Sequence, residues 1–311
     1  MVRSMQMKKI VFICLLTVIC IPELFAQGPI PLWEKGAIPN HRQSEAKEWL
    51  APKDILMIMN VQTPTLEIFL PSKRNANSMA VLIFPGGGYS GVSYDWEGTD
   101  YAKWFNSQGV AAFVLKYRMP QAESVITSFK APIQDAQRAI RFIRFNASKF
   151  NINKNKIGVI GSSAGGHLAS TLGTHLDINY YKPQNDVDKE SARPDFMMLI
   201  YPVISMKKGI THGGSRDSLL GKKPSEDLIL QFSNELQVTE KTPPTFIVHS
   251  GNDNAVPVEN SIRLYQALVK NKIEVTLHIF PKGGHGYSMG HSRNNAPNWT
   301  NLAAQWLQSL N

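Results

Sequence analysis

Residues 161–165 read Gly-Ser-Ser-Ala-Gly, a G-x-S-x-G pattern with Ser163 at its centre. An apolar run precedes the pattern and small and apolar residues follow it, so a strand, a tight turn and a helix are predicted. In such a turn the central residue has a strained backbone that projects its side chain from the carboxyl edge of the sheet. Ser163 is therefore a candidate nucleophile, with Ser162 at a variable position. The alternative is a turn of small residues that only permits close helix–strand packing.

A serine hydroxyl is a weak nucleophile at neutral pH, so it needs a base and a carboxylate that orients the base. Asp253 lies in the loop after the predicted strand 245–250, and His285 lies in a glycine-rich loop after the predicted strand 275–280. The order Ser163, Asp253, His285 is the one expected with this serine turn, and each residue follows a strand. Taken singly, the aspartate could instead stabilise a turn and the histidine could be a loop residue.

Four other residues are weaker candidates for the base or the carboxylate. His249 and His278 lie within predicted strands, and His291 has no comparable framing by a strand and glycines. Asp195 precedes a strand instead of following one. None of the four is therefore preferred over Asp253 or His285.

The third requirement is a set of N–H donors for the oxyanion that develops on a substrate carbonyl. Three glycines, 86–88, follow the predicted strand 79–84, where bare backbone can approach a ligand closely. Together with the N–H group of Ala164, the N–H groups of Gly87 and Gly88 are predicted to form this oxyanion hole.

A competing interpretation of the same loop is a dinucleotide-binding turn. Gly86, Gly88 and Gly91 satisfy G-x-G-x-x-G after a strand. The segment 92–98 is not predicted to begin a helix, however, and the next strand ends in Lys-Tyr-Arg (116–118), without the acidic residue that would bind a ribose. The pattern therefore favours an oxyanion hole over a nucleotide site.

Short and nearly continuous apolar runs predict the strands that position these residues. Such runs are typical of strands buried on both faces of a sheet. They span residues 79–84, 109–117, 156–161, 196–201, 245–250 and 275–280. Two earlier runs, 55–59 and 65–70, are predicted to form a hairpin or an adjacent strand pair.

Helix-like stretches alternate with these strands. The clearest is 131–150, with apolar residues at three- and four-residue spacing and Pro132 where a first helical turn tolerates it. Others span about 164–173, 225–236, 258–271 and 299–310. The alternation predicts one α/β domain: a mainly parallel sheet with an antiparallel N-terminal start, helices on both faces and no large cap domain.

The first residues have the pattern of a signal peptide, predicted over 1–26. Basic residues precede the apolar stretch 10–21, and Ala26 is the small residue before the expected cleavage point. Twelve apolar residues are fewer than the ~20 of a membrane-spanning helix, so an anchor is the weaker alternative. The translation start could be Met1, Met5 or Met7.

Export would leave a secreted or periplasmic protein without thiols. Cys14 and Cys20 both lie in the predicted signal peptide, which argues against disulfides and cysteine metal sites. A lipoprotein signal that ends at Cys20 is a minor alternative. Residues 27–54 are predicted to be an N-terminal extension and 55–311 the catalytic domain.

The charge of the chain is moderately positive. Its 33 basic and 24 acidic residues give +9, and loss of residues 1–26 would leave +7. This excess suits anionic surfaces or acidic glycans. No run of basic residues is interleaved with aromatic ones, which argues against nucleic-acid binding.

From about residue 55 to the end, the chain resembles the α/β-hydrolase superfamily, in particular the esterase branch related to hormone-sensitive lipase and bacterial acetyl xylan esterases. The motifs that carry the resemblance are PGGGY (85–89), DWEG (95–98), YR (117–118), G-x-SAGGHLA (161–169) and GGHG (283–286). Pro85 replaces the histidine that usually begins the glycine motif. This replacement leaves the glycine N–H donors in place.

The resemblance implies a secreted serine esterase that removes acetyl groups from xylan or a similar hemicellulose. By this resemblance Ser163 attacks the acetyl ester, His285 transfers the proton, and Asp253 orients the imidazole. No metal or organic cofactor is required, and no membrane contact is expected after cleavage. The alternatives are a feruloyl esterase, a carboxylesterase for small esters, or a hydrolase-fold binding protein without activity. The oligomeric state is left open.

Residues near the expected site indicate a sugar substrate more than a lipid. The polar, glycine-containing segment 203–223 is the one stretch long enough to cover the site. Tyr89, Tyr94 and Trp96 could stack on a pyranose ring or pack locally. Glu97 could bind sugar hydroxyls or fix its loop.

Overall fold

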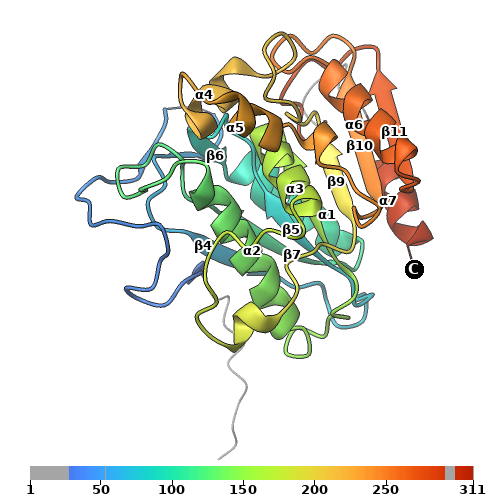
Figure 1. Cartoon of the computed structure of the whole chain (residues 1–311). Coiled ribbons are helices and arrows are strands. Elements are labelled where there is room, and N and C mark those ends of the chain that lie inside the picture. Colours follow the sequence, from blue (N-terminus) through green and yellow to red (C-terminus); the bar gives the residue numbers. More distant parts are fainter. Residues whose placement is uncertain (1–27, 53, 291–297, 311) are drawn as a thin grey trace, which may run out of the picture.

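The computed structural model describes residues 28–52, 54–290 and 298–310. Its main sheet has eight strands in the order β1-β4-β7-β5-β8-β9-β10-β11 (Figure 1). Their bounds are Ile30–Pro31 (β1), Thr65–Phe69 (β4), Ala80–Phe84 (β5), Ala111–Lys116 (β7), Ile157–Ser162 (β8), Met197–Ile200 (β9), Thr245–Ser250 (β10) and Val275–Phe280 (β11). A second sheet has the order β2-β3-β6, with bounds Trp49–Leu50, Met57–Met59 and Gly91–Ser93.

The strand pairing confirms the predicted sheet. From β7 to β11 every pair of neighbours is parallel, whereas β4 pairs antiparallel with β7 and with β1. The central strands β5, β8 and β9 are buried along their whole length, which explains their continuous apolar sequences. Because parallel strands share one direction, the loops that follow them meet at one carboxyl edge.

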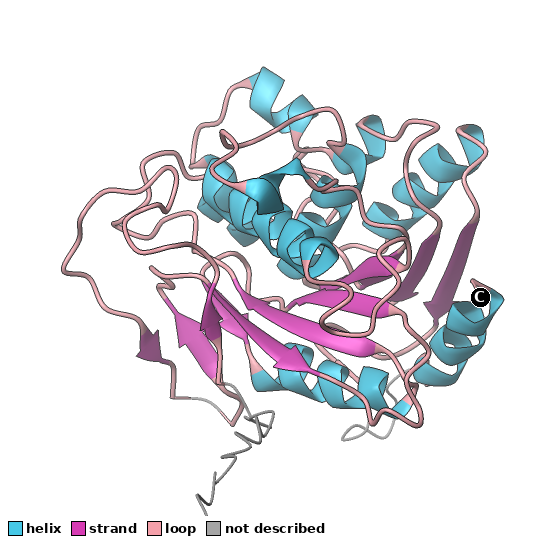
Figure 2. Cartoon of the chain, turned by 90° about the horizontal axis from the view of Figure 1, so that it is seen from below, coloured by secondary structure: helices cyan, strands magenta, loops and turns pink. Residues whose placement is uncertain are grey.

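Helices cover both faces of this sheet (Figure 2). Their bounds are Asp100–Ser107 (α1), Lys130–Phe145 (α2), Ala164–Thr174 (α3), Gly213–Leu220 (α4), Glu226–Gln231 (α5), Glu259–Lys270 (α6) and Thr300–Ser309 (α7). α1 and the start of α7 pack together through Trp104 and Trp299, and α2 packs against α3 on the opposite face. The result is the α/β-hydrolase fold, with three layers.

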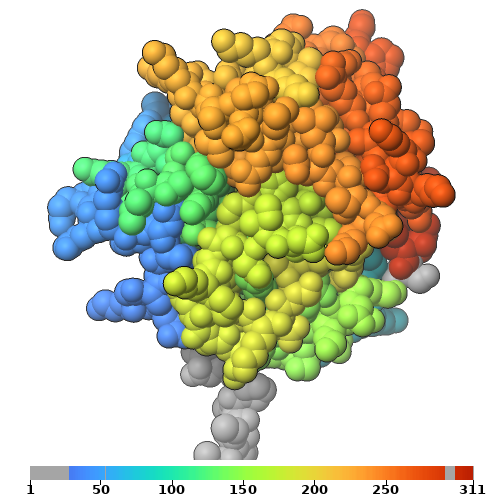
Figure 3. Space-filling view, viewed as in Figure 1, coloured from blue at the N-terminus to red at the C-terminus, as the bar shows by residue number. Residues whose placement is uncertain are grey.

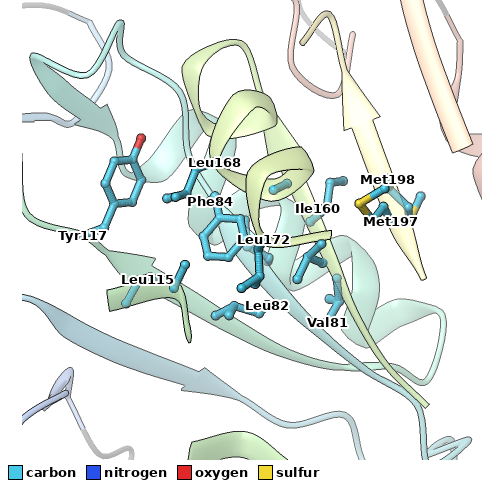
Figure 4. Close-up of a cluster of buried hydrophobic side chains, with 14 of the residues drawn as sticks. Val81, Leu82, Phe84, Leu115, Tyr117, Ile160, Leu168, Leu172, Met197 and Met198 are labelled. Atoms are coloured by element: carbon cyan, nitrogen blue, oxygen red, sulfur yellow. The ribbon is translucent and has the colours of Figure 1, made fainter. Parts of the chain in front are cut away.

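The core lies where α3 packs on the centre of the sheet (Figure 4). Phe84 from β5 and Ile160 from β8 are fully buried, and Leu168 and Leu172 of α3 are nearly so. Full burial of such a side chain stabilises the fold by about 1.5–3 kcal/mol relative to exposure. This packing holds α3, and the turn that precedes it, firmly against the strands.

Two details of the sequence prediction are wrong. Residues 55–59 and 65–70 do not form a hairpin, because β3 belongs to the small sheet and β4 to the large one. Asn60, at the end of β3, has a φ of 55° that turns the chain away from an extended path. Segment 92–98 was expected not to begin a helix, yet a π-helical turn, η1 (Asp95–Thr99), leads directly into α1.

The N-terminal segment that the structure describes packs on the main sheet. β1 pairs with β4, and Trp33 is buried with its indole N–H donating to Asp135, 2.9 Å away. The predicted signal peptide, both cysteines and His291 lie outside the described residues. Within the described ranges, no helix combines the length and the apolar character that crossing a membrane requires.

Candidate active site

The turn between β8 and α3 has the strained backbone predicted for it. Ser163 adopts φ 54° and ψ −119°, in the left-handed region that side chains disfavour. A Cβ atom on Gly161 would lie 2.1 Å from the carbonyl oxygen of Gly165, and one on Gly165 would lie 2.0 Å from that of Phe84. The pattern therefore needs both glycines, because no larger residue fits this close contact of strand and helix.

The structure brings the three distant polar residues together. His285 Nε2 lies 2.9 Å from the hydroxyl of Ser163, and His285 Nδ1 lies 2.6 Å from Oδ2 of Asp253. Since the carboxylate can only accept, Nδ1 carries the proton and Nε2 is the acceptor for the serine hydroxyl. This arrangement is that of a nucleophile, a base and an orienting carboxylate.

Both oxygens of the Asp253 carboxylate accept hydrogen bonds from the protein. Oδ1 accepts from the backbone N–H groups of Ala255 and Val256, and Oδ2 accepts from His249 as well as from His285. Burial by itself raises the pKa of the Asp253 carboxyl, but hydrogen bonds from the two histidines, the charge of His285 and the Val256 N–H outweigh it. The pKa is held well below its usual value, so the group stays ionised.

His249 fixes the carboxylate and does not compete as the base. Its Nε2 lies 3.2 Å from Asp253 Oδ2 and 3.0 Å from the carbonyl oxygen of Val256, while Nδ1 lies 2.7 Å from the hydroxyl of Ser261. Two acceptors at Nε2 require the proton there, so Nδ1 accepts from the serine. The sequence analysis missed this role, although the spacing of four residues to Asp253 is visible in it.

The glycine loop after β5 lies beside Ser163, as the sequence analysis expected. Gly87 (φ 141°) and Gly88 (φ 65°) line the same pocket as Ser163 and adopt backbone conformations that other residues rarely take. Ala164 is the first residue of α3, where a helix leaves its N–H groups without an intrahelical acceptor. Within the described residues, neither glycine N–H group has a hydrogen-bond acceptor.

A buried carboxylate anchors this loop. Glu97 is 4% exposed, and its Oε2 accepts from the N–H of Gly86 at 2.7 Å, while Oε1 accepts from the hydroxyl of Tyr201 at 2.6 Å. Burial raises the pKa of Glu97, and these two hydrogen bonds and the charge of His285 partly offset the rise. Of the two roles considered for Glu97, the structure shows that it fixes the loop.

The turn that carries Glu97 is tied to the loop that carries His285. The indole N–H of Trp96 donates to the carbonyl oxygen of Gly286 at 3.0 Å. In the opposite direction, the hydroxyl of Ser288 donates to the carbonyl oxygen of Trp96. The glycine loop and the histidine loop are therefore connected through one turn.

These groups open into a pocket of about 740 Å³ at the carboxyl edge. Its lining also includes His212, from the segment between β9 and β10 that was expected to cover the site. His212 precedes α4, and its Nδ1 accepts from the backbone N–H of Ser215 at 3.2 Å, which assigns the ring proton to Nε2. Burial and the charge of His285 lower the pKa of His212, so its ring is neutral. The sequence analysis did not single out this residue.

Only one of the three aromatic residues considered for sugar stacking lines this pocket. Trp96 does so. The hydroxyl of buried Tyr89 lies 2.9 Å from Nδ1 of His167, and Tyr94 is buried and donates to Glu67. Tyr89 and Tyr94 therefore pack locally.

The remaining candidates have structural contacts. Ser162 is fully buried, and its hydroxyl lies 2.9 Å from that of Tyr101. His278 lies within β11 and packs on Phe246. Asp195, directly before the buried part of its strand, accepts from the N–H of Ile157. None of the three lines the pocket.

The glycines of the competing nucleotide pattern have a different use. They lead into β6, whose residue Gly91 pairs with Met59, and the helical turn η1 begins only afterwards. A Cβ atom on Gly87 would lie 2.2 Å from the carbonyl oxygen of Gly91. A helical turn does follow the glycine loop, but β6 separates the two, so the loop is not the strand–turn–helix of a dinucleotide-binding site.

Comparison with known proteins gives concordant matches. Over 246 residues the chain is 37% identical to an acetylxylan esterase of Xylanibacter ruminicola, covering 78% of this chain and 46% of the relative. Over 213 residues it is 40% identical to endo-1,4-beta-xylanase B of Butyrivibrio fibrisolvens, covering 68% of this chain and 33% of the relative. The chain thus spans less than half the length of these two relatives.

A solved structure matches nearly the whole chain. The acetyl ester-xyloside bifunctional hydrolase from Caldicellulosiruptor lactoaceticus superimposes with a TM-score of 0.76 and is 38% identical, covering 91% of this chain and 96% of that one. The BD-FAE family model matches residues 66–268, which include the glycine loop, Ser163 and Asp253. The chain therefore belongs to the BD-FAE family and has the α/β-hydrolase fold.

Proposed function

We propose that this protein is a serine esterase that removes acetyl groups from xylan or a similar hemicellulose. The observation that carries the proposal is the hydrogen-bonded chain from Ser163 through His285 to Asp253, which ends in a pocket beside backbone N–H groups that have no acceptor among the described residues. The named activities of the relatives, acetylxylan esterase and acetyl ester-xyloside hydrolase, support the acetyl group and the xylan backbone.

In the first step the hydroxyl oxygen of Ser163 attacks the acetyl carbonyl carbon. The serine proton moves to Nε2 of His285, the nitrogen that accepts from it in the structure. The resulting imidazolium is stabilised by the ionised carboxylate of Asp253 at 2.6 Å. The carbonyl oxygen takes up the negative charge and is bound by the N–H groups of Gly87, Gly88 and Ala164.

The intermediate then collapses to an acyl-enzyme. The bond between the acetyl carbon and the sugar oxygen breaks, and the imidazolium returns its proton to that oxygen, so the sugar leaves as an alcohol. Water repeats the sequence: it gives a proton to Nε2 of His285, its oxygen attacks the acetyl carbon, and Ser163 leaves with the proton. Acetate is released and the enzyme is restored.

The pocket lining is consistent with a short acyl group on a sugar. Beside the aromatic ring of Trp96, it presents polar side chains from Ser90, Ser93 and Asp95 and apolar ones from Ile55, Met57 and Met59. A lining of this kind can stack one face of a pyranose and bind its hydroxyl groups.

The experiment that tests the proposal compares three acyl groups on matched esters. Release of acetate from acetylated xylan is measured beside hydrolysis of feruloyl and butyryl esters. We expect the highest kcat/KM with the acetyl ester of the polysaccharide. A strong preference for feruloyl or butyryl esters would contradict the acetyl assignment but leave the serine mechanism intact.

We also propose that the protein is exported with removal of residues 1–26. The basic residues, the apolar stretch 10–21 and Ala26 support this proposal. Expression with the native N-terminus, followed by N-terminal sequencing of the mature protein, should give Gln27 as the first residue. A mature protein that keeps the apolar stretch would contradict it.

A further inference from the structure

The cover segment between β9 and β10 forms a second hollow, of about 580 Å³, next to α4. This segment makes up the upper part of the face seen in Figure 3. The hollow is strongly cationic, since five basic residues line it and only one acidic residue does. These are Lys207, Lys208, Arg216, Lys222 and Lys223, with Glu226 as the acid.

The side chain of Arg216 is buried in this lining and forms no hydrogen bond with the described residues. Only 8% of the residue is exposed, and its Nε atom is inaccessible to solvent and unpaired within the described chain. The nearest carboxylate, that of Asp217, lies 4.0 Å away, too far for a hydrogen bond, and is itself half exposed. A guanidinium that has lost most of its water, and whose carboxylate neighbour is 4.0 Å away, has a strong tendency to bind an anion.

Two other buried arginines have close carboxylate partners, although the Nε atom of Arg138 is unpaired as well. On α2, Arg138 pairs with Asp188 at 2.8 Å and Arg144 with Asp195 at 3.1 Å. The lysines of the hollow resemble Arg216 instead. Among the described residues, neither Lys222 nor Lys223 forms an ion pair. Glu226 in the lining and Asp217 beside Arg216 therefore offset only part of the positive charge of the hollow.

The hollow is one helical turn away from the pocket of the candidate active site. His212, which lines that pocket, accepts a hydrogen bond through its carbonyl oxygen from the N–H of Arg216, which lines the hollow. Four residues of an α-helix rise by about 6 Å. A glycan bound at the candidate active site can therefore extend a substituent into the hollow.

We propose that this hollow binds the carboxylate of a uronic acid side group on the hemicellulose substrate. The inference rests on the proposed function, because it takes a glycan in the neighbouring pocket as given. A guanidinium binds a planar carboxylate through two parallel hydrogen bonds, and lysines at the rim add attraction without a fixed geometry. The preferred substrate is then an acetylated, acidic xylan and not a neutral one.

Calorimetry tests binding without relying on catalysis. A xylo-oligosaccharide with one uronic acid side group is titrated into the full chain, and the same oligosaccharide without that group serves as reference. We expect about tenfold tighter binding of the acidic ligand, with the difference reduced by added salt. Equal affinity for both oligosaccharides would overturn the proposal.

Inorganic phosphate as a third ligand separates a glycan site from a general anion site. Phosphate binding as tight as that of the acidic oligosaccharide would also overturn the proposal.

Substitution of two exposed lysines tests the hollow without disturbing the fold. Lys222→Gln with Lys223→Gln should lower the preference for the acidic oligosaccharide by about three- to tenfold and leave the neutral one unchanged. The matched control is Lys270→Gln with Lys272→Gln, two exposed lysines before the amino end of β11, at the opposite edge of the sheet. The control should keep the full preference; an equal loss in both variants would mean that only net charge matters.

Kinetics separates failure of this inference from failure of the proposed function. On acetylated oligosaccharides with and without the uronic acid group, the wild type should show a higher kcat/KM for the acidic one. Arg216→Gln should remove this difference while keeping turnover of the neutral substrate. Acetate release that is equal for both substrates would sink the inference alone. Acidic-ligand binding without acetate release from either substrate would contradict the proposed function alone.

Discussion

The two walls of the pocket differ in how their polar groups are partnered. On the wall formed by the loops after β10 and β11, Asp253 accepts four hydrogen bonds, two from backbone N–H groups and two from histidines. The cover segment carries His212, which lines the pocket with its Nδ1 occupied, and Arg216, which lines the neighbouring hollow and has an unpaired Nε. The carboxylate of Asp253 is therefore fully hydrogen-bonded without a ligand, whereas the guanidinium of Arg216 keeps an unpaired donor.

This difference indicates a division of labour between the walls. Groups that take part in bond breaking need a fixed geometry, and full hydrogen bonding in a buried site supplies it. Groups that select a substrate need unpaired donors that a ligand can satisfy. Substitutions on the first wall should therefore lower kcat, and those on the second should alter KM and substrate preference.

The largest effect is expected from Ser163→Ala. The variant should lose about 10⁴- to 10⁶-fold in kcat for acetate release, because no nucleophile remains. Its neighbour provides a matched control: Ser162→Ala removes a buried hydroxyl that is hydrogen-bonded to Tyr101 and does not line the pocket, so activity should persist with about 1 kcal/mol less stability. Full activity of Ser163→Ala would refute the nucleophile assignment.

Asp253→Asn should rank next, with a loss of about 10³- to 10⁴-fold in kcat. An amide cannot orient His285 and stabilise its charged form as a carboxylate does.

The lowered pKa of Asp253 adds a test of stability against pH. The wild type gains stability above the unfolded carboxyl pKa of about 3.9, and loses it as the pH falls through the lower folded value. Urea unfolding between pH 5 and 2 should show a shallower decline for the variant.

Glu97→Gln should lower kcat by about 10- to 100-fold with a smaller change in KM. The carboxylate accepts from both Gly86 and Tyr201, and an amide keeps only one acceptor oxygen, so the glycine loop shifts. Glu67→Gln is the control, because Glu67 accepts from Tyr94 outside the pocket and its loss should leave kcat unchanged. If both variants kept wild-type kcat, Glu97 would not position the loop.

The smallest effect is expected on the cover wall. His212→Asn retains a side chain that caps α4 but removes the ring Nε2–H group, so KM should rise about three- to tenfold with little change in kcat. Thermal unfolding should be close to that of the wild type. A loss confined to kcat would place His212 with the groups of the first wall and break the comparison.

Most of the first wall could be predicted from sequence because its residues follow strands. Parallel strands end at one edge, so a serine, an aspartate and a histidine after β8, β10 and β11 necessarily approach each other. His249 and Glu97 act through other residues, and their burial and partners depend on packing that no local pattern encodes. The role of His249 emerged only from the structure, and for Glu97 the structure decided between the two roles that the sequence left open.

The cover wall and the N-terminal strands were predicted less well for a different reason. α4 is a short helix that begins with two glycines, and its apolar periodicity is weak. The pairing of β3 with β6 joins segments more than 30 residues apart, and sequence neighbours such as β3 and β4 look like a hairpin when that partner is unknown. Local propensity cannot decide between such partners.

The connection through Trp96 has a consequence for exchanging parts between related enzymes. Trp96 is hydrogen-bonded to Gly286 and Ser288, and the next residue, Glu97, is hydrogen-bonded to the glycine loop. The conformation of the histidine loop therefore affects the position of the oxyanion donors. A graft of residues 281–290 from a relative would succeed only together with the matching tryptophan turn. We therefore expect residues 281–290 and the turn that contains Trp96 and Glu97 to change together among related enzymes.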